Sequence, residues 1–102
     1  MPQPESSEAL AYEACARAAL SAISAAERRD AESGTRSLGR AQRQMRLLCG
    51  VLPPHARRVR VSKQIVERAE KAVQAAACRR TDRELAKACS AARRSSELAL
   101  SR

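Results

Sequence analysis

The chain has 102 residues, a formal net charge of +9 and one tyrosine as its only aromatic residue. This length suits a single domain over residues 1–102, with too small an interior for both a packed core and a catalytic cleft. The scarcity of aromatic rings argues against binding nucleic acid by base stacking. We therefore expect a binding role rather than an enzymatic one, with no cofactor and no small-molecule substrate.

Alanine dominates the apolar residues, which make up 44% of the chain. Because burial contributes about 25 cal/mol per Å² of apolar surface, an alanine core contributes less than a leucine or phenylalanine core of equal length. Small domains with thin cores are commonly reinforced by other chains. This favours a subunit of a larger protein assembly, or a homo-oligomer.

Arginine supplies most of the positive charge. Its planar guanidinium suits two-pronged contacts with phosphate or carboxylate groups, and the net charge speeds association with acidic partners. A GC-rich genome would enrich alanine and arginine together, since both have GC-rich codons. The charge is therefore either functional or a product of genome composition.

The first predicted helix covers residues 8–32, with Ser6 or Ser7 as its cap. Its polar residues recur at steps of three or four, which leaves one narrow polar stripe on an otherwise apolar helix. Such a helix needs cover on more than one side, so we expect it to be the most buried element. The stripe consists of Glu13, Arg17, Ser21, Ser24 and Arg28.

The apolar stretch 9–26 is not expected to span a membrane, because Glu13 and Arg17 interrupt it. Glu5 and Glu8 stand where a secretory signal would carry basic residues. We expect an intracellular protein that is not bound to a membrane.

Residues 30–34 are predicted to form a turn, with Gly34 in the left-handed conformation that often ends helices. A second helix is expected over 35–49, starting late or kinked at Gly39, where glycine costs about 1 kcal/mol of helix propensity. The residues predicted to face the first helix are Leu38, Ala41, Met45, Leu48 and Leu52, and a different face carries Arg36, Arg40 and Arg43.

The strongest break in the chain is Gly50 followed by Pro53 and Pro54. We expect an extended, basic connector over residues 51–61. His55 lies in this connector and lacks a neighbouring nucleophile, which indicates a solvated residue rather than a catalytic base. The arginines of the connector are Arg57, Arg58 and Arg60.

A third helix is predicted over 62–80, and a fourth begins after the capping box formed by Thr81 and Glu84. The third helix is expected to bury Ile65, Val66, Ala69, Ala72, Val73 and Ala76, and the fourth Leu85, Ala88, Cys89, Ala92 and Ala99. The pattern predicts an all-α fold of four helices, paired as two antiparallel hairpins (8–50 and 62–101) in an up-down bundle or an open helical array. No internal repeat is convincing in the sequence.

Each predicted helix carries one cysteine: Cys15, Cys49, Cys78 and Cys89. They are interpreted as reduced core residues, as two disulfides (Cys15 with Cys49, Cys78 with Cys89) or as metal ligands. Cys78 shares a polar face, which weakens the second disulfide, and no two ligands have the short spacing of a zinc site. The Cys78–Cys89 pair resembles half of the paired-cysteine pattern of helical-hairpin proteins of the mitochondrial intermembrane space. That compartment would apply if the cysteines are disulfide-bonded.

The candidate contact residues are three arginine groups, on the second helix, in the connector and at the turn before the fourth helix. We expect them to contact acidic groups of a protein partner; the alternative is phosphate-backbone contact in a nucleic-acid or ribonucleoprotein complex. They are Arg36, Arg40 and Arg43; Arg57, Arg58 and Arg60; and Arg79, Arg80 and Arg83.

Overall fold

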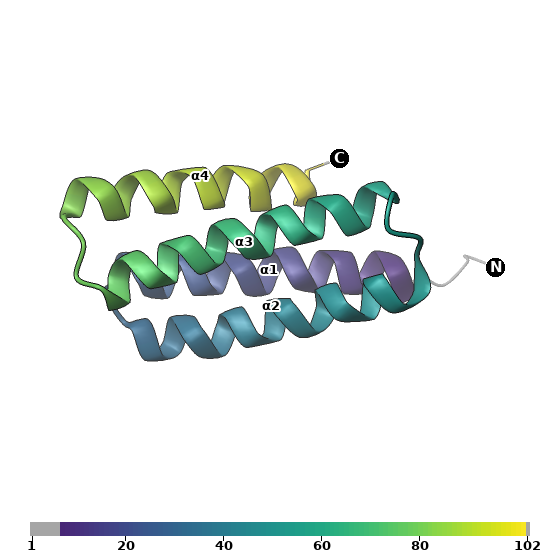
Figure 1. Cartoon of the computed structure of the whole chain (residues 1–102), viewed down its shortest axis with the longest axis horizontal. Coiled ribbons are helices and arrows are strands. Elements are labelled where there is room, and N and C mark those ends of the chain that lie inside the picture. The colour runs from purple at the N-terminus through teal and green to yellow at the C-terminus, as the bar shows by residue number, and fades with distance from the viewer. Residues whose placement is uncertain (1–6, 102) are drawn as a thin grey trace.

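The computed structural model describes residues 7–101, which form four α-helices and no strand (Figure 1). The all-α prediction is confirmed. Ser7 is already helical, and Ser6 lies outside the described residues. The helices are α1 (Ser7–Glu27), α2 (Ala31–Val51), α3 (Arg57–Ala77) and α4 (Asp82–Leu100).

The helices alternate in direction along the long axis of the molecule (Figure 1). α1 and α3 each contact all three other helices, whereas α2 and α4 do not contact each other. α1 is therefore covered on more than one side, as predicted, but it is not the most buried element alone, because α3 is equally central and buries at least as many residues. α2 and α4 flank this central pair on different sides, so their outer faces are well separated.

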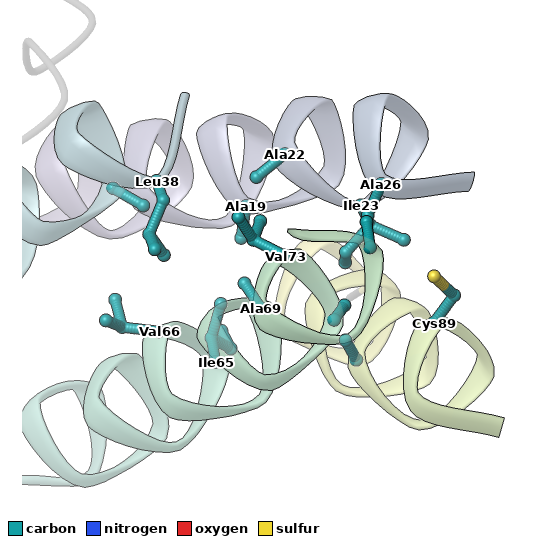
Figure 2. Packing of buried hydrophobic residues seen from close by; sticks show 14 of the residues in the cluster. Ala19, Ala22, Ile23, Ala26, Leu38, Ile65, Val66, Ala69, Val73 and Cys89 are labelled. Carbon is teal, nitrogen blue, oxygen red and sulfur yellow. The ribbon is translucent and has the colours of Figure 1, made fainter. Parts of the chain in front are cut away.

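Alanine makes the close approach of α1 and α3 possible. More than half of the buried apolar residues in the described part of the chain are alanine, including Ala19 and Ala69, neither of which is exposed to solvent. Figure 2 shows Ala19 of α1 on the side that faces α3, with Val73 beside it. Because an alanine methyl group is smaller than a leucine side chain, the axes of α1 and α3 can lie closer together, and both helices then contribute to one core. The few large buried side chains, such as Ile23 and Ile65, fill the remaining space.

The turn after α1 differs from the prediction. Arg29, not Gly34, adopts the left-handed conformation, with a φ of 57°. The N–H of Asp30 donates to the carbonyl of Ala25 at 2.9 Å, and the N–H of Arg29 donates to Ala26 at 2.9 Å. These two bonds define a Schellman ending, in which an arginine occupies the position usually held by glycine.

Gly34 lies inside α2, which begins at Ala31 because the Asp30 carboxylate accepts a hydrogen bond from the N–H of Ser33 at 3.1 Å. A Cβ atom on Gly34 would lie 3.1 Å from Cγ2 of Val73, so the absence of a side chain lets α2 approach α3. The turn predicted at Gly34 and the late helix start at Gly39 are both wrong.

The connector is shorter than predicted and covers only residues 52–56. Helix α2 continues through Gly50 to Val51, and α3 begins at Arg57, so residues 57–61 are helical rather than extended. Burial explains the early start of α3, because Val59 is enclosed in a small cluster with Ala11 and Leu48. The proline break itself is confirmed.

The turn after α3 repeats the geometry of the first turn. Arg79 has a φ of 53°, and the N–H of Arg80 donates to the carbonyl of Ala75 at 3.0 Å. Thr81 then caps α4 as predicted, by accepting from the N–H of Glu84 at 3.2 Å, but the return bond of the capping box, from the N–H of Thr81 to the Glu84 carboxylate, is not formed. The Glu84 carboxylate lies 3.9 Å from the Arg80 guanidinium.

The two halves of the chain correspond in structure although the sequence shows no clear repeat. α3 begins and ends 50 residues after α1, from 7 to 57 and from 27 to 77. Contacts of α1 with α4 are matched by contacts of α3 with α2, as an approximate twofold relation requires. The corresponding positions that are buried in both halves include Cys15 and Ile65, Ala19 and Ala69, Ala22 and Ala72, Ile23 and Val73, Leu38 and Cys89, and Ala41 and Ala92.

Candidate interaction surface

The structure keeps the three predicted arginine groups apart. Arg36, Arg40 and Arg43 form an exposed stripe along α2. The second group lies in the first turn of α3, at the end of the bundle that holds the connector (Figure 1). The third group lies at the opposite end, around the turn between α3 and α4. No single basic face therefore unites them.

The third group is partly engaged inside the molecule. The guanidinium of Arg29 donates to the backbone carbonyl of Arg80 at 2.9 Å and to the Asp82 carboxylate at 2.7 Å. These bonds tie the two helix–helix turns together. Arg80 also lies near Glu84, so within this third group Arg79 and Arg83 are the members without a carboxylate partner in residues 7–101.

The second group contacts the start of α1. The Arg58 guanidinium lies 5.8 Å from the centre of the Tyr12 ring and 3.9 Å from the Glu8 carboxylate. Burial raises the pKa of Tyr12, and the positive charges of Arg57 and Arg58 partly oppose that rise. A hollow of about 390 Å³ opens beside Tyr12, but the acidic and basic side chains that line it, Glu13 with Arg17 and Arg58 with Glu8, are already paired.

The acidic side chains are largely used in internal pairs, which leaves the outer arginines free. The carboxylates within 4.0 Å of a basic side chain are Glu8, Glu13, Glu27, Glu32, Glu67, Asp82 and Glu84. On α2, Arg36 pairs weakly with Glu32 at 4.0 Å, and Arg40 donates to the Ser37 hydroxyl. Neither Arg43 nor Arg46 has a partner among the described residues.

Exposed apolar side chains, which the sequence interpretation missed, lie beside this α2 stripe. Leu47 is 59% exposed and Val51 is 65% exposed, and Leu10 of α1 is 52% exposed. At 100° per residue, Leu47 and Val51 fall on the same face of α2 as Arg40 and Arg43. This spacing is visible in the sequence, so the signal was available.

A groove lies between α1 and α2, and two of its lining residues, Arg40 and Gln44, also adjoin Leu47. It has a volume of about 330 Å³, and its lining residues are Ala14, Arg17, Ala18, Ser21, Arg40 and Gln44. Because α1 and α2 run in opposite directions and Ala11 packs in one cluster with Leu48, Leu10 is expected at about the height of Leu47 along the bundle, with Val51 one turn further along α2. We call the groove together with Leu10, Leu47 and Val51 the α1–α2 surface.

The corresponding place on the other half is closed. Arg68 takes the position of Ala18, and its guanidinium donates to the hydroxyl of Ser95, which corresponds to Gln44. Leu98, 66% exposed, and Arg94 correspond to Leu47 and Arg43, but Glu97 stands where α2 has Arg46. Arg68 therefore fills the place between α3 and α4 that is open between α1 and α2, although a hollow of about 430 Å³ that includes Glu97 remains on α4 beside Leu98 and Arg94.

All four cysteines are free thiols, so neither of the two hypothesised disulfides is present. Cys15 and Cys89 are buried, whereas Cys49 and Cys78 are exposed, which places the members of each suggested pair in different environments. Burial raises the pKa of Cys15 to about 11, opposed in part by the Ser62 hydroxyl, which has no other polar partner. Burial, together with the charge of Glu27, also raises the pKa of Cys89.

We expect a thiol reagent at pH 8 to modify two cysteines quickly and two slowly. Cys49 and Cys78 should react within minutes, because they face solvent, while Cys15 remains protonated and enclosed. Mass spectrometry of peptides after timed labelling would assign the sites. Fast labelling of Cys15 under native conditions would contradict the packing of α1 against α3.

No group of three or more His, Cys, Asp or Glu side chains in residues 7–101 is arranged to hold a metal ion. Within the same range, no helix has the length and hydropathy needed to cross a membrane. Comparison with protein-family models, with curated proteins and with solved structures found no match. The function is therefore inferred from the residues themselves.

Proposed function

We propose that this chain is a non-enzymatic, basic helical subunit or adaptor that binds into a larger protein assembly through its outer helix faces. The observation that carries the proposal is the α1–α2 surface, where exposed leucine and valine side chains adjoin arginines without internal partners. Exposed apolar groups bordered by charge are typical of protein-binding sites. By contrast, the hollow beside Tyr12 and the turn between α3 and α4 both contain internal ion pairs.

The alternative is a component that binds the phosphate backbone of nucleic acid. Unpaired arginines such as Arg43, Arg83 and Arg94 support it, because phosphate binding needs free cations. Their distribution favours the protein partner, since α2 and α4 do not touch and carry their charges on different sides. Exposed leucine next to the cations also suits a protein surface better than a phosphate backbone.

Recovery of the complex from the native host tests this function. A tagged chain washed at moderate salt, with and without nuclease, should retain the same protein partner. That partner, produced separately, should form a complex of fixed stoichiometry with the purified chain, as measured by light scattering. Release of the bound material by nuclease, or steeply salt-dependent retention of a generic oligonucleotide without any protein complex, would favour the alternative.

A further inference from the structure

We propose that the α1–α2 surface is a docking groove for one acidic amphipathic helix of a partner protein; this rests on the proposed function. The apolar side of the partner helix would cover Leu10, Leu47 and Val51, which are all more than half exposed. Its carboxylates would pair with the arginines of α2.

The shape of the surface favours a helix. Arg36, Arg40, Arg43 and Leu47 follow one another at steps of three or four along α2 and cover about 16 Å, or three helical turns. The groove beside them is floored by Ala14, Ala18 and Ser21, whose small side chains allow another helix to approach closely. A helix that binds in a groove presents its own apolar anchors at steps of three and four, so an amphipathic helix of about three turns would match the length of this surface.

The charge of the surface selects an acidic partner. Arg43 and Arg46 have no carboxylate within reach in residues 7–101, and the groove itself contains Arg40 and the paired Arg17. A second copy of this chain would bring like charges face to face, which disfavours self-association through this surface. In a partner helix, glutamate or aspartate side chains would pair with the arginines, and an adjacent apolar stripe would cover the exposed leucines.

The second half of the chain provides a matched control. Leu98 and Arg94 correspond to Leu47 and Arg43, but the adjacent groove is filled by Arg68, which is bonded to Ser95. A substitution made at both places changes the total charge equally. Any difference in binding then reports the groove and not the overall charge.

The test uses a fluorescent synthetic helix-forming peptide with leucines at every third or fourth position and glutamates on both flanks. Fluorescence anisotropy at low salt should show saturable binding with one peptide per chain. Leu47→Glu should weaken binding at least about tenfold, as expected for a central anchor, whereas Leu98→Glu should weaken it less than about twofold. Arg43→Glu should likewise weaken binding more than Arg94→Glu, and the difference should shrink at high salt. Circular dichroism should show unchanged helicity, since all four side chains face solvent.

Several results would overturn the groove. One is an equal loss of peptide affinity in Leu47→Glu and Leu98→Glu. Others are no binding of the glutamate peptide at low salt, or equal binding of a peptide in which lysines replace the glutamates. The last is displacement of the peptide by an oligonucleotide, if the Leu47→Glu variant no longer binds that oligonucleotide. A dimer of the chain that Leu47→Glu dissociates would show that a second copy is the occupant. A native protein complex that survives Leu47→Glu would retain the proposed function but refute the groove, whereas absence of any protein partner would refute the function.

Discussion

Replacing Ile23 with alanine is expected to destabilise the protein by about 2 to 5 kcal/mol, because it removes one of the few large side chains from an alanine-built core. Ile23 has no solvent exposure and belongs to the core cluster to which all four helices contribute (Figure 2). Neighbouring alanines are too short to fill the cavity. For a chain of this size, with a total stability of about 5 to 15 kcal/mol, the loss is a large fraction.

Urea unfolding followed by circular dichroism measures this effect. Ile23→Val should cost only about 0.5 to 1.5 kcal/mol, and Leu98→Ala, at a site 66% exposed, should change stability by less than about 0.5 kcal/mol. A cost below about 1 kcal/mol for Ile23→Ala would mean that the core is not packed as described.

Replacing Gly34 with leucine is expected to destabilise the bundle by about 1 to 3 kcal/mol through overpacking. The first added carbon would already lie 3.1 Å from Cγ2 of Val73 and 3.6 Å from the carbonyl oxygen of Ala22. Leucine adds three more carbons in a place where α2 meets both central helices. The gain in helix propensity, about 1 kcal/mol, is too small to offset a displacement of α2.

Gly39 supplies the matched control for this substitution, because a Cβ atom there would meet nothing within 4 Å. Gly39→Leu should stabilise the protein by up to about 1 kcal/mol in the same unfolding experiment. Combining Gly34→Leu with Val73→Ala should cost less than the sum of the two single changes, since the smaller residue relieves the contact. Strict additivity would show that Val73 is not the residue that Gly34 accommodates.

The buried faces of the helices could be predicted from the sequence because they depend on local spacing. The six residues assigned to the core of α3, from Ile65 to Ala76, are all buried, and Thr81 caps α4 as its capping-box pattern predicted. The Pro53–Pro54 break also lies between helices. Each of these features is encoded within one or two helical turns.

Features that depend on contacts between helices could not be predicted in this way. Glycine is typical of helix ends, but Gly34 lies inside α2 and leaves space for Val73, which is 39 residues further along the chain. Arg29 and Arg79 end helices in a conformation that favours glycine, and arginine gives no local sign of it. Arg57, Arg58 and Arg60 were placed in a connector because the burial of Val59, which extends α3, depends on α1 and α2.

The candidate surface was only half predicted from the sequence. The spacing of Arg36, Arg40 and Arg43 predicted the arginine stripe of α2. Leu47 was not assigned to any surface, and Val51 was expected in the connector rather than on this helix. The closed counterpart on α4 depends on Arg68 reaching Ser95, a contact between two helices that no spacing rule contains.

The two halves of the chain are related by an approximate twofold symmetry, yet their sequences are free to differ. If two identical hairpins associated, every substitution would appear on both sides, so a groove opened on one face would be opened on the other. Joining the halves through residues 52–56 removes that constraint. Ala18 can remain small in one half while Arg68 fills the matching place in the other, and the shared alanine interface is left intact. If the α1–α2 surface binds a partner as proposed, a single polypeptide thus carries the open groove on one half and a groove filled by Arg68 on the other.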